Sequence, residues 1–169
     1  MSEAGTDVVR ERVVRWEDPH AGAAAVRSLS GLDAMRAIIA GDIPSPPIAL
    51  LMGFRLAEAD EGRVVFIAEN PDESLYNPIG VVHGGFACTI LDSAMGCAVQ
   101  STLPVNVGYT TTDVQIRFIR AITAATGPVR CEAKVLHAGR STAVAEGRLV
   151  DGKGKLLAIG TTACAVIRP

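Results

Sequence analysis

One carboxylate stands in a long part of the chain that otherwise carries no formal charge. Asp92 is the only charged side chain among residues 77–112, where 36 residues at the chain's average of 20% would include about seven. Burying an unpaired carboxylate is costly, so its position suggests a function. In an enzyme such a group activates water as a general base or attacks the substrate as a nucleophile. Asp92 is therefore the candidate reactive group.

A pair of glycines precedes Asp92 and is expected to open the same helix. In its first turn, where Gly84 and Gly85 would lie, a helix has N–H groups without partners and a positive dipole end. Glycines let a ligand approach these donors closely. The arrangement suits polarisation of a carbonyl group and binding of the oxyanion that forms from it. The pair is also consistent with a simple tight turn.

The separation of these two features bears on how a site could be built. Gly84 and Asp92 are eight residues apart, which is about 12 Å along an α-helix. That distance is too long for both to act on one carbonyl carbon. If they serve one reaction, Asp92 comes from a second copy of the chain. We therefore expect a homodimer with two equivalent sites, each built from both chains.

The helix itself is expected to be covered on both sides. Its apolar residues recur at helical spacing and form one broad face for packing on a sheet: Phe86, Ala87, Ile90, Leu91, Ala94, Met95 and Ala98. Asp92 falls nearly opposite, among the small uncharged residues Thr89, Ser93 and Gly96. Solvated helix faces usually carry Lys, Glu or Arg. We therefore expect a partner chain or a ligand to cover this face, with room beside Asp92.

Alternating residues on either side of this helix predict an antiparallel sheet. Strands are expected at 53–58, 63–69, 110–119, 129–136, 141–150 and 156–167. The loops at 137–140 and 151–154 are too short for a crossover helix, so they should form hairpins. One long helix with one antiparallel sheet is an α+β layout. Within 110–119, alternation assigns one face to Thr112, Val114, Ile116 and Phe118, and the other to Asp113, Gln115 and Arg117.

The N-terminal part differs in composition from the rest. Eight of the first twenty residues are charged, so residues 1–27 are expected to be a peripheral or flexible extension. Residues 28–169 are expected to form a single domain. It should begin with a short helix over 30–40, with Ser30 as N-cap and Gly41 as the stop. Pro44, Pro46 and Pro47 should prevent any continuation of that helix.

Composition excludes several other classes of function. A net charge of −2 and a pI near 5.9 give no general attraction to nucleic acid or anionic lipid. Asp92 makes a membrane span over residues 78–99 unfavourable. The four cysteines and three histidines are scattered, so no metal site is predicted. The N-terminus is charged and has no apolar core typical of a signal peptide, so a reduced, cytoplasmic setting is expected.

One run of residues resembles a known family. Asn77-Pro78-Ile79-Gly80-Val81-Val82-His83-Gly84-Gly85, followed by Leu91-Asp92, is similar to the PaaI-type thioesterases of the hotdog superfamily. The resemblance covers residues 48–167 and implies a sheet wrapped around one central helix. It implies hydrolysis of acyl-CoA to an acid and free CoA, with no cofactor beyond the CoA of the substrate. It also implies dimers, often paired into tetramers.

The resemblance also assigns residue roles. Asp92 matches the catalytic carboxylate, acting as general base or nucleophile, and the N–H of Gly84 matches the donor to the thioester carbonyl. Asn77 matches a side chain that places substrate or water, Thr111 one that assists the water, and His83 a position whose role is open. Residues expected to bind substrate or CoA are Gly85, Thr89, Arg117, Gly139, Arg140 and Ser141.

Two other functions are compatible with the same resemblance. The Asn77-Pro78 pair superficially resembles the motif of hotdog enoyl-CoA hydratases or dehydratases, although four residues here separate it from His83. A non-catalytic acyl-CoA-binding or sensing protein is the second alternative. The acyl group (aryl, short-chain or medium-chain), the choice between dimer and tetramer, and the choice between base and nucleophile are left open by the sequence.

Overall fold

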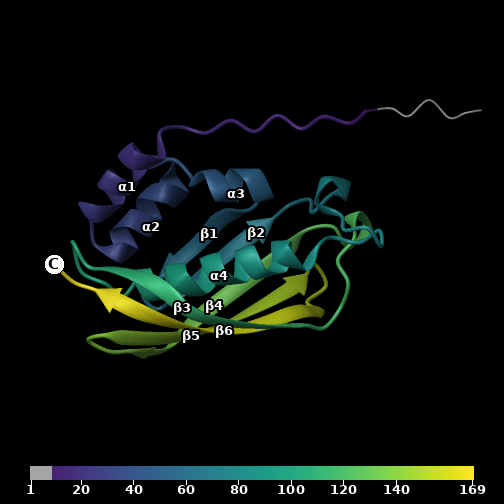
Figure 1. The fold of residues 1–169 in the computed structure, drawn as a ribbon. Coiled ribbons are helices and arrows are strands. Elements are labelled where there is room, and N and C mark those ends of the chain that lie inside the picture. Colours follow the sequence, from purple (N-terminus) through teal and green to yellow (C-terminus); the bar gives the residue numbers. More distant parts are fainter. Residues whose placement is uncertain (1–8) are drawn as a thin grey trace, which may run out of the picture.

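A computed structural model describes residues 9–169 and shows one antiparallel sheet curved around one long helix. The long helix is α4 (Gly84–Gln100). The sheet has the order β1-β2-β4-β5-β6-β3, and every neighbouring pair is antiparallel. In Figure 1, α4 crosses the concave face of the sheet, while the N-terminal helices lie together near one end of it. The predicted α+β class is confirmed.

The six strands lie close to their predicted positions: β1 (Arg55–Asp60), β2 (Arg63–Ala68), β3 (Gly108–Phe118), β4 (Val129–Ala138), β5 (Thr142–Asp151) and β6 (Leu156–Ile167). The β4–β5 and β5–β6 connections are hairpins, as their short loops predicted. The β1–β2 turn is tighter than expected and consists of Glu61 and Gly62 alone. Gly62 has φ of +74°, which glycine adopts without a steric penalty.

Three short helices precede the sheet: α1 (Pro19–Arg27), α2 (Gly31–Ala40) and α3 (Pro47–Met52). Ser30 and Gly41 cap α2 at its two ends, as predicted. The helix α3 was not predicted, because the nearby prolines were interpreted only as helix breakers. Pro47 instead occupies the first turn of α3, where its missing N–H costs nothing and its fixed φ is already helical.

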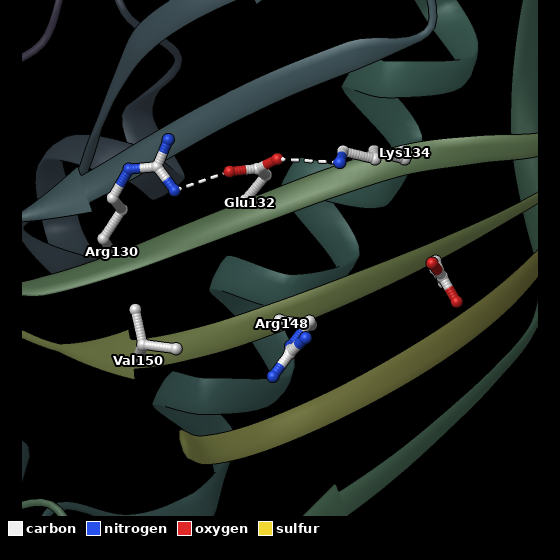
Figure 2. A pocket seen from close by; sticks show the side chains of 6 residues that line it. Arg130, Glu132, Lys134, Arg148 and Val150 are labelled. Atoms are coloured by element: carbon white, nitrogen blue, oxygen red, sulfur yellow. Dashed lines mark hydrogen bonds and ion pairs between the residues drawn. The ribbon is translucent and has the colours of Figure 1, made fainter. Parts of the chain in front are cut away.

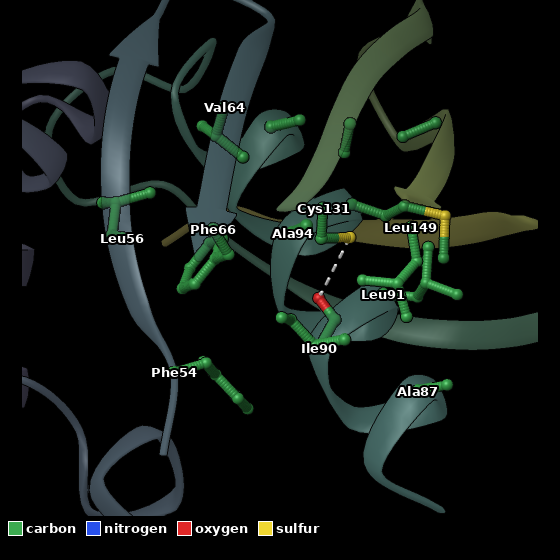
Figure 3. Close-up of a cluster of buried hydrophobic side chains, with 14 of the residues drawn as sticks. Phe54, Leu56, Val64, Phe66, Ala87, Ile90, Leu91, Ala94, Cys131 and Leu149 are labelled. Carbon is green, nitrogen blue, oxygen red and sulfur yellow. Dashed lines mark hydrogen bonds between the residues drawn. The ribbon is translucent and has the colours of Figure 1, made fainter. Parts of the chain in front are cut away.

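The core lies between α4 and the inner face of the sheet. All seven residues of the predicted apolar face of α4 are buried. They pack against inward-facing side chains of the strands, including Leu56, Val64, Phe66, Cys131 and Leu149, as Figure 3 shows. Burial of apolar area on this scale is the main stabilising term of such a domain. In the described part of the chain no helix is long and apolar enough to cross a membrane.

Candidate active site

Asp92 lies half-buried on α4 and is held by a residue of β3. The Thr111 hydroxyl donates a hydrogen bond to Oδ1 of Asp92, with 3.0 Å between the oxygens. The second carboxylate oxygen is not used in this contact. Among residues 9–169, no Lys, Arg or His nitrogen lies within salt-bridge distance of Asp92. The carboxylate is thus oriented by a neutral donor and keeps an acceptor free.

A β-bulge brings Thr111 to Asp92. The register of β3 against β6 shifts between Thr111 and Asp113, so Thr112 is an extra residue and its hydroxyl donates to the Ala163 carbonyl. The bulge reverses the alternation, which turns Thr111 toward α4. The prediction that Thr112 shares a face with Val114 was therefore wrong, because strict alternation assumes an unbroken ladder.

The N-terminus of α4 holds the second part of the candidate site. Gly84 is the first residue of the helix, and no acceptor within the described residues takes its N–H. The next N–H, that of Gly85, is bound by Nδ1 of His83 at 2.8 Å. His83 is therefore the N-cap of α4, a structural role. Of the two glycines, only Gly84 has an N–H available to a ligand.

A hollow of about 340 Å³ opens at Gly84. Asn77 and His83 line it, together with Phe118 and its neighbours at the end of β3. Oδ1 of Asn77 accepts from the N–H groups of Ile79 (3.1 Å) and Val81 (3.3 Å). This contact shapes the loop as an Asx turn and leaves the amide nitrogen of Asn77 outside the turn. Asn77 can thus hold the loop and still donate to a ligand.

Asp92 and Thr111 do not line the hollow at Gly84. The two parts of the candidate site are therefore separate within one chain, as the spacing of about 12 Å along the helix implies. The single chain brings together Asp92 with Thr111, and Gly84 with Asn77 and His83. It does not bring these two groups to one point.

The other residues expected to bind substrate lie in several places. The Thr89 hydroxyl donates to the Gly85 carbonyl at 2.8 Å, so both residues are engaged within the helix. Gly139, Arg140 and Ser141 form the β4–β5 turn beside the end of β6, where the Arg140 carbonyl accepts from Arg168. This turn is two strands away from β3.

Arg117 lies on the outer face of the sheet, in a hollow with Arg148 and Thr161. Within one chain it does not line the hollow at Gly84. A second, more strongly charged hollow of about 290 Å³ adjoins it on the same face, lined by Arg130, Glu132, Lys134, Glu146, Arg148 and Val150 (Figure 2). Since α4 covers the opposite face of the sheet, neither hollow is part of the site that contains Asp92.

The cysteines are free, and their environments disfavour thiolate chemistry. Burial raises the pKa of the Cys97 thiol to about 12, and the nearby charge of Asp92 adds to this effect. Burial likewise raises the pKa of Cys88 and Cys131. A nucleophilic cysteine needs a lowered pKa. Cysteines in such environments are suited to packing.

Two aromatic residues near the site were missed in the sequence. Phe118 covers Gly84, whose added Cβ would lie 3.1 Å from the ring. Tyr109 covers Gly96, where an added Cβ would lie 2.1 Å from the phenol oxygen. The space expected at Gly96 is therefore filled by the chain itself. A glycine inside a helix was a signal of close approach by another group, but the sequence does not identify that group.

Comparison with known proteins identifies a family and relatives that are similar to this chain. A family model described as "Thioesterase superfamily" matches residues 79–158. The "Putative esterase VNG_1336C" of Halobacterium salinarum is 34% identical over 53% of the chain, and the match spans 62% of that protein, less than two thirds of its length. The 1,4-dihydroxy-2-naphthoyl-CoA hydrolase of Listeria monocytogenes is 27% identical, over 68% of the chain and 91% of that enzyme.

Solved structures agree with these matches. The conserved protein PA5202 of Pseudomonas aeruginosa is 32% identical, with a TM-score of 0.66 over 71% of this chain and 93% of that one. The PaaI protein of E. coli, from the phenylacetic acid degradation operon, has a TM-score of 0.70 over 83% and 96% of the two chains. At 23% identity the PaaI match supports the fold alone. The predicted hotdog fold is confirmed.

Proposed function

The chain belongs to the thioesterase superfamily, and from this premise we propose that the protein is an acyl-CoA thioesterase that acts as a homodimer. The observation that carries the proposal is the Asp92–Thr111 pair on the open side of α4. The free N–H of Gly84 at the start of the same helix supports it. The Listeria relative, named as a CoA thioester hydrolase, agrees with this substrate class.

The proposed reaction divides the work between these two groups. The N–H of Gly84 donates to the thioester carbonyl and stabilises the negative charge that develops on its oxygen. Asp92 takes a proton from water as the water oxygen bonds to the carbonyl carbon. The C–S bond then breaks, and the departing thiolate of CoA receives that proton. Direct attack by the Asp92 carboxylate, followed by hydrolysis of the anhydride, is the alternative use of the same residue.

In the proposed dimer each site combines Asp92 and Thr111 of one chain with Gly84 and Asn77 of the other. The exposed edge of β3 supports this arrangement, because β3 ends the sheet and carries Thr111. An unpaired strand edge readily pairs with another chain. Pairing of dimers into tetramers and a cytoplasmic location are further expectations of the same proposal. The proposed chemistry uses water and CoA thioester without an added cofactor.

Release of free thiol from a panel of acyl-CoA substrates tests the activity. A non-catalytic sensor would bind these compounds without releasing thiol. A hydratase would consume the conjugated double bond of an enoyl-CoA without releasing thiol. Either result would contradict the proposed reaction.

The shared site is tested by deleting the donor in one chain and the carboxylate in another. Gly84→Pro removes the N–H at a position where proline suits a helix, and extended His83 (ψ 139°) suits the residue before proline. We expect it to lower the rate about 10²- to 10³-fold. Gly84→Ala is the matched control, because it retains the N–H while adding a side chain beside Phe118.

Mixing inactive Gly84→Pro and Asp92→Asn chains should restore activity. Each mixed dimer contains one site with both groups intact, so an equal mixture should recover roughly a quarter of the wild-type rate. No recovery in dimers that are demonstrably mixed would exclude a site built from two chains.

A further inference from the structure

A cavity of about 390 Å³ lies between the N-terminal helices and the C-terminal half of α4. Residues of α1, α2 and the segment 43–47 form one side, while α4 and the start of β3 form the other. Its side chains are mostly apolar and include Val26, Met35, Ile38, Ile43, Cys97 and Tyr109. This volume is within the range of about 300–1,000 Å³ found for small-molecule sites.

The cavity is adjacent to Asp92 along two elements. On α4, Cys97 follows Asp92 by five residues, a rise of about 7.5 Å. On β3, Tyr109 is two residues before Thr111 and therefore faces the same side of the strand. The charge of Asp92 contributes to the raised pKa of both the Cys97 thiol and the Tyr109 phenol, after burial. Tyr109 is packed on Gly96 and lines the cavity.

The N-terminal wall of the cavity is anchored to α4. Gly31, the first residue of α2, donates its N–H to the Leu103 carbonyl at 2.9 Å. A side chain at Gly31 would lie 1.7 Å from the Gln100 carbonyl oxygen, so only glycine allows this approach. The wall lies before residue 79, where the match to the family model begins.

We propose that this cavity holds the acyl group of the substrate, an apolar chain of medium length. The inference rests on the proposed function, since it assigns the direction in which the acyl chain extends from the thioester carbon. An acetyl group is too short to pass Tyr109, whereas an octanoyl group extends from Asp92 into the cavity.

The charges at the rim favour the acyl group over the CoA nucleotide as occupant. Glu17 and Asp18 line the cavity beside a single cation, Arg27. Two carboxylates would repel the CoA phosphates, and the apolar walls offer them few donors. Each methylene that enters an apolar site adds a factor of about four to binding. The same factor should appear in kcat/KM for each methylene beyond Tyr109.

Two neighbouring alanines of α1 provide a matched test. Ala23 and Ala24 are both exposed, but only Ala23 lines the cavity. Ala23→Phe should fill part of the cavity and lower the ratio of octanoyl-CoA to acetyl-CoA kcat/KM at least tenfold. Ala24→Phe should retain the wild-type ratio. An unchanged ratio in folded Ala23→Phe would overturn the assignment, even with full thioesterase activity.

A binding measurement separates this inference from the proposed function. Octanamide, a neutral stand-in for the acyl group, should bind the wild type and Ala24→Phe in calorimetry, and Ala23→Phe at least tenfold more weakly. If no acyl-CoA is hydrolysed but octanamide binds in this pattern, the cavity assignment holds and the proposed reaction fails. Equal affinity in all three proteins, or none in the wild type, would overturn the cavity assignment.

Discussion

Asp92 and Glu132 are carboxylates associated with opposite faces of one sheet, and their surroundings differ in kind. Glu132, on the outer face, accepts from Arg63 (3.1 Å) and Arg130 (2.6 Å) and pairs with Lys134 (3.3 Å). Figure 2 shows it bracketed by Arg130 and Lys134 on the same strand. Asp92, on the helix that covers the inner face, contacts the neutral hydroxyl of Thr111.

The difference indicates which carboxylate is available for chemistry. Hydrogen bonds from Arg130 and Arg63 lower the pKa of Glu132 to about 2, so its charge and lone pairs are committed to the network. A carboxylate in that state is a poor base. Among residues 9–169 no such cation pairs with Asp92, and its second oxygen is open to a ligand. Counting charged partners therefore separates a structural carboxylate from a candidate catalytic one.

Removing the charge of each carboxylate is the strongest test of this difference. Asp92→Asn should lower kcat about 10³-fold, because a general base contributes about 10²–10⁴-fold. Its unfolding midpoint in urea should stay close to that of the wild type. Glu132→Gln serves as the control and should retain the wild-type kcat. Activity of Asp92→Asn within tenfold of wild type would remove Asp92 from the mechanism.

Variants of two adjacent threonines test the role of the neutral hydroxyl that donates to Asp92. Thr111→Val keeps the side chain's shape but removes the donor to Asp92, so we expect kcat to fall about tenfold, or roughly 1.4 kcal/mol. Thr112→Val removes a hydroxyl that bonds to the Ala163 carbonyl on the other side of the bulge. It should leave kcat nearly unchanged. Equal losses in both variants would mean that the bulge itself, and not the donor, matters.

The smallest expected effect concerns stability at the outer face. Glu132→Gln should lower the free energy of unfolding by about 1–2 kcal/mol at pH 7, an amount reduced by the partial exposure of the network. Because folding lowers the pKa of Glu132, its stabilising contribution is complete above the unfolded value of 4.5 and is lost as pH falls toward about 2. Urea unfolding at pH 7 and pH 3 should thus show a smaller difference from wild type at pH 3. A constant difference would contradict this linkage.

Local patterns in the sequence were sufficient for much of the fold. The periodicity after Phe86 predicted the buried face of α4, because burial on one side of a helix imposes a repeat on the residues themselves. Short polar loops predicted the β4–β5 and β5–β6 hairpins for a similar reason, since too few residues are available for a crossover. The absence of other charges around Asp92 was equally local and identified the carboxylate before any contact was known.

The partners of those residues depended on contacts between distant segments. The direction of Thr111 is determined by the register of β3 against β6, and one extra residue reverses it. Tyr109 fills the space over Gly96. The sequence does not indicate which side chain of a strand contacts which glycine of a helix. Local periodicity reports only that a residue is covered. The group that covers it depends on packing among segments far apart in the chain. The Asp92–Thr111 contact and the acyl cavity are therefore evident only from the tertiary structure.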